Sequence, residues 1–325
     1  MTEINVNITR RSALLGAASV AVAGVALSHG TEPVLAANDV SGANTIPYAR
    51  HKLGSFDVVT LLDGAVTGDN PQGTFGMNVT PDEFAQVSEE NFIPADRTKF
   101  YFTPTVVNTG SELVLFDTGV GEGGRPARGN LRALLASIGH TPEEIDLVVI
   151  THMHPDHIGG LMESGAPAFP NARYAIGRVE FDVWSAMDPE ANGVTKLIAK
   201  NVTPLAGKMA FLEDGAQVAS GITAVAAFGH TPGHMTYHIE SDGHRLLIAA
   251  DTAAHYIYSL GFPDWEVRFD MDKAAAAETR KKLFGMLAAD RIPFIGYHMP
   301  FPSVGYVETR NSGFRYVPAS YQLNL

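Results

Sequence analysis

The chain has 325 residues, of which 45% are hydrophobic and 18% are charged, so it can form one large domain or two ordinary ones and is neither disordered nor fibrous by composition. A formal net charge of -12, with no run of lysine and arginine, argues against a nucleic-acid partner. The chain contains no cysteine, so disulfides and thiolate ligands are excluded and any metal must be held by histidine, aspartate or glutamate.

The first residues have the features of an export signal. Arg10 and Arg11 precede a weakly apolar stretch over 13–27, which is too short to span a bilayer comfortably and is followed by small residues suited to cleavage. The paired arginines resemble the twin-arginine export signal. We expect a signal peptide over 1–37, a linker over 38–47, and a periplasmic or secreted protein without membrane association after export. The alternative is an ordinary tail with two chance arginines.

The next part of the chain predicts short strands and helices. Apolar runs bounded by turn residues indicate the strands, and a capping threonine, a proline and a glutamate over 141–144 indicate the start of a short helix. The predicted elements are strands over 56–62, 105–108, 113–116 and 147–150, and helices over 128–137 and from 142. The strands over 105–108 and 113–116 are expected to form a hairpin.

The second half continues the pattern without a linker or repeat, so we predict a single domain over 48–325. Its predicted elements are strands over 222–227, 235–240, 246–250 and 293–295, and a helix over 273–289 capped by Asp272. Strands of both alternating and continuous apolar character, interspersed with helices, indicate mixed sheets covered by helices. Chemistry is then expected at the strand ends, where the histidines lie.

Residues 151–160, THMHPDHIGG, directly follow a predicted strand and carry a cluster of candidate metal ligands. These are His152, His154, Asp156 and His157. Neutral imidazole offers a lone pair for a metal, and an aspartate adds charge and can bridge two ions. In an extended segment positions 152, 154 and 156 share a face, and a turn at Pro155 lets the last two ligands reach a second centre. A single zinc takes three protein ligands and a water, so four candidates indicate two ions.

Three more candidates follow predicted strands or turns further along the chain. They are His230 in the sequence GHTPGH, Asp251 after an apolar run, and His298 after Gly-Tyr. The sequences HMHPDH and GHTPGH, the lone aspartate and the late histidine together resemble the metallo-β-lactamase superfamily. The resemblance covers about residues 50–325. It implies an α+β fold, a four-layer αββα sandwich of two mixed β-sheets covered by helices, with the metal site between the sheets.

The resemblance also assigns roles to individual residues. The ligands of the first ion would be His152, His154 and His230, those of the second Asp156, His157 and His298, with Asp251 bridging the two. Asp117 would be a buried aspartate that orients the loop over 151–160, called the ligand loop below. His234 would be a supporting histidine that binds no metal.

Within the superfamily the chain resembles the methyl parathion hydrolase group and its lactonase and arylesterase relatives, on segments 106–110, 151–162, 229–234, 300–305 and 313–321. This resemblance places Trp184 in a leaving-group pocket, which His255 could also reach, and implies that the chain can form a homodimer. Residues 119–125 are glycine-rich where organophosphate hydrolases carry a bulky aromatic, and Ala254 stands where acyl-homoserine lactonases carry a tyrosine.

The expected function is that of a dinuclear hydrolase in which a metal-bridging hydroxide attacks a lactone or aryl ester, with phosphotriesters as side substrates. Asp156 would transfer a proton to the leaving group. Zn²⁺ is the favoured metal, and Mn²⁺, Fe²⁺ or Co²⁺ also suit nitrogen and oxygen ligands. The alternatives on the same fold are a β-lactamase, a redox iron protein and a non-catalytic metal-binding protein.

Overall fold

The structure is a computed structural model that describes residues 47–321 and 324–325. The signal peptide predicted over 1–37 and the linker predicted over 38–47, apart from its last residue, lie outside the described residues. The described residues belong to one compact unit. None of the described helices combines the length and the apolarity that crossing a membrane requires.

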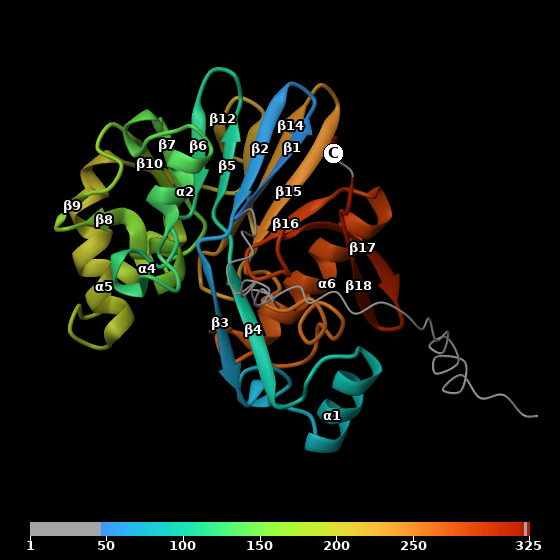
Figure 1. Cartoon of the computed structure of the whole chain (residues 1–325). Coiled ribbons are helices and arrows are strands. Elements are labelled where there is room, and N and C mark those ends of the chain that lie inside the picture. Colours follow the sequence, from blue (N-terminus) through green and yellow to red (C-terminus); the bar gives the residue numbers. More distant parts are fainter. Residues whose placement is uncertain (1–46, 322–323) are drawn as a thin grey trace, which may run out of the picture. The chain divides into compact units, whose positions relative to one another are not determined.

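The first of two large sheets has seven strands and mixes antiparallel with parallel pairs (Figure 1). In spatial order they are β1 (Tyr48–Leu53), β2 (Phe56–Leu61), β5 (Thr105–Asn108), β6 (Leu113–Phe116), β7 (Leu147–Ile150), β10 (Arg173–Gly177) and β11 (Met209–Leu212). The predicted hairpin is confirmed, because Thr105 pairs with Phe116 and Asn108 with Leu113. β6 and β7 are parallel. The residues that follow them, Asp117 and the ligand loop, therefore emerge at the same edge of the sheet.

The second sheet also has seven strands. They are β12 (Gln217–Ala219), β13 (Ile222–Ala226), β14 (Met235–Ser241), β15 (His244–Ala250), β16 (Phe294–Gly296), β17 (Val304–Arg310) and β18 (Gly313–Pro318). β15 and β16 are its parallel pair, whereas the other neighbours are antiparallel. Asp251 follows β15 and His298 lies two residues after β16, so the parallel pair brings both to one edge.

Separate hydrophobic clusters hold sheets and helices together in four layers. Between the sheets, side chains from both inner faces interdigitate, with the rings of Phe116 and Tyr237 5.2 Å apart. The outer face of the first sheet packs against helices through Leu134 and Ile198, and that of the second through Phe284. The αββα sandwich of two mixed sheets is thereby confirmed. Burial on both faces explains why these strands are continuously apolar.

The helices and short strands outside the large sheets complete the fold. They are α1 (Pro81–Glu90), α2 (Leu131–Ser137), α3 (Pro155–Ile158), α4 (Arg178–Ser185), α5 (Gly193–Asn201), α6 (Lys273–Asp290), β3 (Gly64–Asp69), β4 (Arg97–Phe102), β8 (Met162–Glu163) and β9 (Ala166–Pro167). α6 begins as predicted, since the side chain of Asp272 accepts the N–H of Ala275 at 3.0 Å. The short helix from 142 is a single turn over Pro142–Glu144.

Several predicted boundaries differ from the structure by one or two residues, and the start of one helix differs by three. The helix expected over 128–137 begins only at Leu131. Gly129 has a φ of +80°, which is incompatible with a helix, and its N–H donates to the side chain of Asp63 at 2.9 Å. The helix therefore begins later than predicted, because this tertiary contact holds Gly129 outside it.

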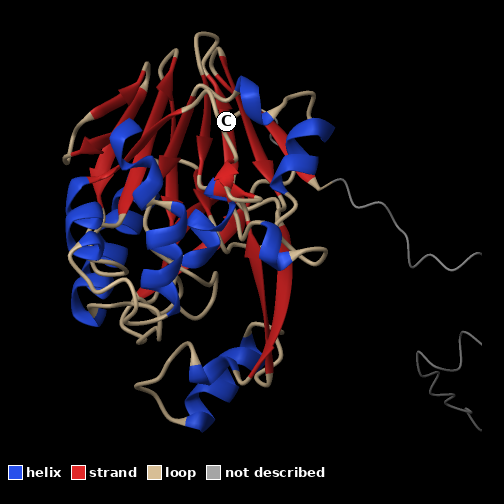
Figure 2. Cartoon of the chain, turned by 90° about the vertical axis from the view of Figure 1, so that its left-hand side faces the viewer, coloured by secondary structure: helices blue, strands red, loops and turns tan. Residues whose placement is uncertain are grey.

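A two-stranded extension, for which the sequence pattern predicted no structure, leaves the sandwich toward α1 (Figure 2). It consists of β3 paired with β4. The side chain of Thr80 caps α1 by accepting the N–H of Glu83 at 3.2 Å. Phe84 of α1 stacks on Tyr258 with ring centroids 4.5 Å apart, which fixes the extension beside the segment that follows Asp251. The extension supplies one wall of the cavity described below.

Candidate metal centre

The ligand loop leaves β7 and turns into α3, so its side chains reach two positions. His154 is extended (φ -70°, ψ 154°), and Pro155 then begins the single helical turn that carries Asp156 and His157. The carbonyl of His157 accepts both the N–H and the hydroxyl of Thr118 at 2.8 Å, which holds the turn against the end of β6. The change from extended chain to helix separates the two pairs of ligands, as the sequence pattern predicted.

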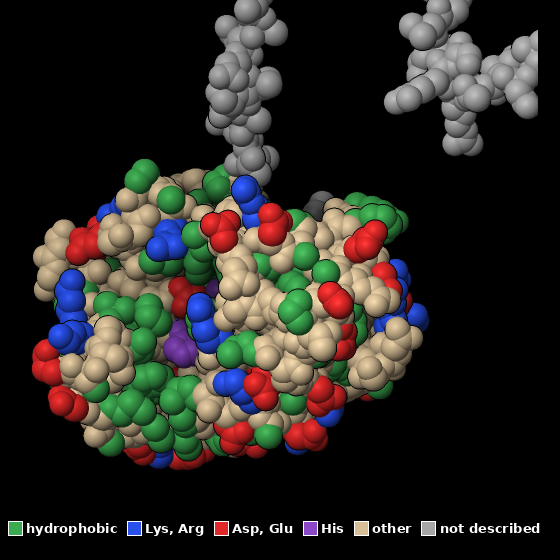
Figure 3. All heavy atoms as spheres, turned by 90° about the horizontal axis from the view of Figure 1, so that it is seen from below, with side chains coloured by type: hydrophobic (Ala, Val, Ile, Leu, Met, Phe, Trp, Pro, Cys, Tyr) green, Lys and Arg blue, Asp and Glu red, His purple; other side chains and the backbone are tan. Residues whose placement is uncertain are grey.

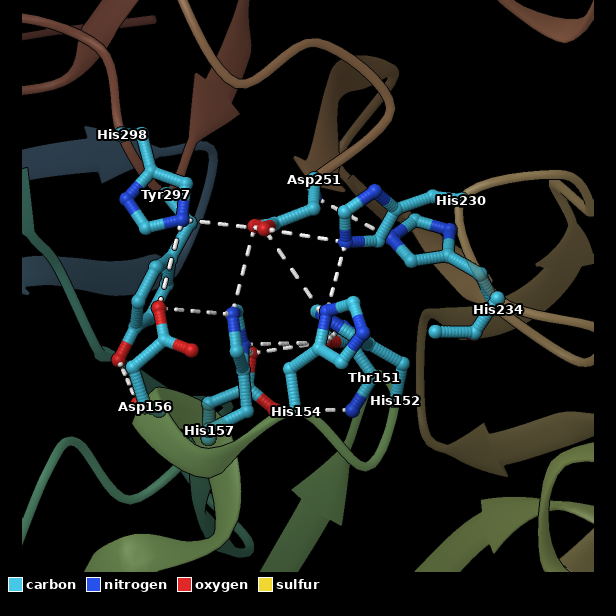
Figure 4. A network of polar contacts seen from close by, with 12 residues as sticks. Thr151, His152, His154, Asp156, His157, His230, His234, Asp251, Tyr297 and His298 are labelled. Carbon is cyan, nitrogen blue, oxygen red and sulfur yellow. Dashed lines mark hydrogen bonds and ion pairs between the residues drawn. The ribbon is translucent and has the colours of Figure 1, made fainter. Parts of the chain in front are cut away.

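Seven side chains form two adjoining groups in which all ligand atoms of a group lie within 4.8 Å of one another (Figure 4). The first group is His152, His154, His230 and Asp251, and the second is Asp156, His157 and His298. The structure therefore brings together the complete set of residues singled out as ligands in the sequence.

In the first group three imidazole nitrogens converge. Nδ1 of His154 lies 3.1 Å from Nε2 of His152 and 2.9 Å from Nε2 of His230. Oδ2 of Asp251 lies 3.4 Å from Nε2 of His230. His152 and His230 are buried, so this group is largely shielded from bulk water.

In the second group two imidazoles flank a carboxylate. Oδ2 of Asp156 lies 3.5 Å from Nε2 of His157 and 3.4 Å from Nε2 of His298. Asp251 reaches this group as well, with Oδ1 3.4 Å from His157 and Oδ2 3.0 Å from His298. Figure 4 shows its carboxylate between the two groups, the place expected for a bridging ligand.

Buried carboxylates fix the tautomers of two of these histidines. Nδ1 of His157 lies 2.8 Å from Oδ2 of Asp117, and Nδ1 of His230 lies 2.9 Å from Oδ1 of Asp270. An ionised carboxylate only accepts, so each Nδ1 carries the proton and donates it. Nε2 of His157 and of His230 is then left with a bare lone pair directed into the centre.

Neutral oxygen atoms fix the tautomers of His152 and His298 in the same way. Thr151 donates its hydroxyl to Asp117 at 2.9 Å, so its oxygen accepts from Nδ1 of His152 at 3.0 Å. Nδ1 of His298 donates to the carbonyl of Tyr101 at 2.7 Å. All four imidazoles thus present Nε2 as an acceptor.

Such convergent acceptors require a cation. Nε2 of His157 and Oδ1 of Asp251 are buried, 3.4 Å apart and without a hydrogen-bond partner among the described residues. Lone pairs in contact repel one another unless a metal ion or a proton lies between them, and an unpaired buried polar atom costs about 1–3 kcal/mol. The donor set, nitrogen and carboxylate oxygen only, suits Zn²⁺ and related divalent ions. The residues present therefore fit a pair of metal ions.

The electrostatics of the centre favour positive charge. Burial disfavours the imidazolium of His230, but hydrogen bonds to Asp251 and Asp270 raise its pKa to about 9. Burial likewise opposes ionisation of Asp156, yet His157 and His298 lower its pKa to about 2. Protons or metal ions compete for the same lone pairs, so metal binding is expected to release protons.

Asp117 and His234 lie where a supporting role requires them. Asp117 is buried with a φ of +59°, and its Oδ1 accepts the N–H of Thr151 at 2.8 Å while its other oxygen holds His157. Nε2 of His234 accepts the N–H of Asp251 at 3.1 Å, so that nitrogen faces the backbone. The two residues hold the ends of β7 and β15 around the centre.

Two side chains predicted for the substrate pocket are buried beside the cavity, and the ring of Trp184 lies edge-on to that of His154 with centroids 6.3 Å apart. Trp184 is 6% exposed in the core between the first sheet and its helices, where its indole N–H donates to Glu180 at 2.9 Å. His255 stacks on Tyr258 at 4.4 Å, and its Nδ1 accepts two backbone N–H groups. Neither lines the cavity above the metal centre. For Trp184 the bulk and apolarity that suggest a pocket also suit a core position.

Three buried charged residues near the centre were missed from the sequence. Asp270 orients His230 and is itself held by Arg280 of α6 at 2.7 Å. Glu180 of α4 accepts the N–H groups of Met153 and Gly233 at 2.8 and 2.9 Å, and so joins the two histidine-bearing loops. No motif marks these positions, because each is defined only by partners far away in the chain.

The centre lies at the floor of a cavity of about 650 Å³. His154, Asp156 and His298 line it together with phenylalanines and valines of the surrounding loops and of the β3–β4 extension. Figure 3 shows histidine and acidic side chains at the bottom of this hollow, with hydrophobic side chains around it. A small, mostly apolar molecule can therefore reach the metal ligands.

Comparisons with known proteins agree with this geometry. Residues 103–294 match the family model of the metallo-beta-lactamase superfamily. An N-acyl homoserine lactonase of Bacillus cereus is 26% identical over 122 residues, and one of a Bacillus species is 28% identical over 109 residues. These matches cover 38% and 34% of this chain, and the chain spans only 44% and 38% of the two relatives.

Solved structures match over most of the chain. The dizinc quorum-quenching lactonase AidC, in complex with its product N-hexanoyl-L-homoserine, is 26% identical with a TM-score of 0.79, covering 84% of this chain and 98% of AidC. The hydrolase AbOPH is 23% identical with a TM-score of 0.77, covering 85% of this chain and 98% of that protein. At that lower identity the second likeness supports the fold alone.

Proposed function

We propose that this chain, which belongs to the metallo-β-lactamase superfamily and is a metal-dependent hydrolase, opens small-molecule lactones at a pair of divalent metal ions. The observation that carries the proposal is the set of seven convergent ligand side chains at the floor of an accessible cavity. The likeness to a dizinc lactonase along nearly its whole length supports the choice of substrate.

The chain's own residues set the conditions for hydrolysis. Two bound divalent ions would act as Lewis acids and lower the pKa of water toward roughly 7. The first would be held by His152, His154 and His230, the second by Asp156, His157 and His298, with Asp251 shared.

Asp156 is the group that we propose moves a proton. It lines the cavity, and Tyr297 fixes its backbone by donating its hydroxyl to the carbonyl at 2.6 Å. Phe100 and Phe102 present their rings edge-on to His298 at 5.5 and 5.7 Å and exclude water from that side. Asp156 can therefore carry a proton to the departing alkoxide of the opened ring.

The test is a substrate screen of the purified protein loaded with zinc. We expect lactones with five- and six-membered rings (γ- and δ-lactones) to be hydrolysed faster than β-lactams and phosphotriesters, and aryl esters at intermediate rates. The release of acid measures each reaction. His152→Ala should abolish lactone hydrolysis and reduce the bound zinc measured by elemental analysis. Zinc binding without hydrolysis of any of these compounds would instead indicate a metal-binding protein, and an iron-coloured protein without hydrolysis a redox protein.

We also propose that the chain is exported through its paired arginines, Arg10 and Arg11. In a bacterial host, cell fractionation should find the mature enzyme in the periplasm. Replacing both arginines by lysine should retain it in the cytoplasm, whereas an unchanged distribution would contradict the proposal.

A further inference from the structure

We propose that the cavity selects substrates that carry a free carboxylate, which binds to Arg128 and Arg268. The inference rests on the proposed lactonase function and narrows its substrate class. Both arginines line the same cavity as the metal ligands. In Figure 3 cationic side chains lie next to the histidine in the hollow.

Both guanidinium groups lie on aromatic rings of the cavity wall. That of Arg128 lies 5.8 Å from the ring centroid of Phe102, and that of Arg268 lies 4.9 Å from that of Phe269. Stacking leaves the N–H edge of a guanidinium free to donate. In the part of the chain that the structure describes, neither group forms an ion pair or a side-chain hydrogen bond. Their donors are therefore available to a ligand.

The loop that carries Arg128 is held by a buried carboxylate. Oδ2 of Asp63 accepts the N–H of Gly129 at 2.9 Å and that of Val120 at 3.0 Å. The side-chain amide of Asn130 also donates to the carbonyl of Asp63 at 3.2 Å. Asp63 is fully buried, so the backbone beside Arg128 is fixed by contacts that water does not weaken.

The loop that carries Arg268 is fixed in a comparable way. Its own N–H donates to the carbonyl of Thr74 at 2.8 Å, and the N–H of Met271 donates to the carbonyl of His230 at 3.0 Å. Between them Asp270 forms the buried ion pair with Arg280. Arg268 is exposed, but its loop is attached both to Thr74, in the segment that follows β3, and to the backbone of the predicted metal ligand His230. Preorganised cations of this kind lose little freedom when an anion binds.

The charge balance at the mouth favours an anion, although the protein as a whole is acidic at -12. Asp156 and Asp251 are the predicted ligands of two divalent ions and would be neutralised by them. The remaining carboxylate of the lining, Asp69, lies opposite Arg97 in the β3–β4 register. Arg128 and Arg268 are then the uncompensated charges. A planar carboxylate matches the fork of a guanidinium, so a lactone with an apolar chain ending in a carboxylate fits both lining and charge.

The experiment compares two γ-lactones with side chains of equal length, one ending in a methyl group and the other in a carboxylate. With the zinc-loaded enzyme at low ionic strength, kcat/KM should be about tenfold higher for the carboxylate lactone, as expected for one charge-assisted contact. Added salt should reduce this ratio. Arg268→Gln and Arg128→Gln should each bring the ratio toward one. Arg245→Gln removes an equal charge from the exposed beginning of strand β15, outside the cavity, and should leave the ratio unchanged.

Equilibrium binding distinguishes failure of the inference from failure of the proposed function. Calorimetry with the opened hydroxy acid of each lactone should show tighter binding of the dicarboxylate, and Arg268→Gln should remove the difference. Equal or better turnover of the neutral lactone, with equal binding, would overturn the carboxylate subsite and leave the lactonase intact. Turnover of neither lactone would refute the lactonase function, while the binding difference would still decide the subsite.

Discussion

The two groups of metal ligands differ in what holds their histidines in place. In each group one imidazole is backed by a buried carboxylate, Asp270 behind His230 and Asp117 behind His157. Asp117 is held locally by Thr151, at the start of the ligand loop itself. Asp270 is held by Arg280, a charged side chain on a distant helix. The support of His230 therefore depends on long-range packing, whereas the support of His157 comes from residues that directly follow the parallel strands β6 and β7.

Asp251 does not belong to one group alone, because its carboxylate contacts histidines of both groups. Asp251→Ala removes the carboxylate that contacts His230, His157 and His298. We expect kcat/KM to fall by about a thousandfold or more and neither ion to bind tightly. Enzyme assays with elemental analysis would measure this. Asp264→Ala, an exposed aspartate paired with Lys281, is the control. Two retained ions would refute a bridging role.

Asp270→Asn should weaken the first group selectively. An asparagine NH₂ must face either Nδ1 of His230, favouring the wrong tautomer, or the guanidinium of Arg280, where donor meets donor. We expect affinity for one of two zinc ions to fall by about 10–100-fold, and unfolding free energy to fall by about 3–5 kcal/mol since Arg280 is left unpaired. Competition with a chelator and Co²⁺ absorption spectra measure the first effect, and denaturant unfolding the second.

The control for this variant is Asp272→Asn, two residues away. Asparagine caps a helix as well as aspartate does, so α6 should begin as before and both ions should bind as in the parent protein. Equal weakening by the two substitutions would indicate a general disturbance of the loop, contrary to the role inferred for Asp270.

Asp117→Asn should show the converse pattern. Oδ2 of Asp117 accepts from both His157 and Thr151, so an amide NH₂ there would displace the proton of His157 onto the metal-binding nitrogen. The ion of the second group should then bind about 10–100-fold more weakly. The stability loss should be smaller, about 1–3 kcal/mol, because no opposite charge is left unpaired. If calorimetric titration shows that this variant and Asp270→Asn lose the same ion, then Asp117 and Asp270 do not support separate metal ions.

Trp184→Phe should give the smallest effect. It removes one hydrogen bond to Glu180 and keeps most of the buried ring, so we expect a loss of about 1 kcal/mol in denaturant unfolding. Because Trp184 lies outside the cavity lining, KM for a lactone should stay the same. A severalfold rise in KM would restore the pocket role predicted from the sequence.

The sequence alone was sufficient for the parts of the protein that are encoded locally. The strands at β7 and β15, the capping of α6 by Asp272 and the close spacing of His152 to His157 all follow from periodicity and side-chain chemistry over a few residues. The distant His230, Asp251 and His298 could be found because each follows a strand or turn with a recognisable pattern.

Tertiary structure alone decided the features that depend on long-range contacts. Asp63 is a buried acceptor whose contact with Gly129 delays the start of the predicted helix to Leu131. No local sequence pattern marks Asp270 or Arg280. The size and apolarity of Trp184 suit a core position as well as a pocket. Burial and hydrogen-bond partners are properties of residues that meet in space, so no local pattern encodes which charge is sheltered, which tautomer is fixed, or which ring faces the cavity.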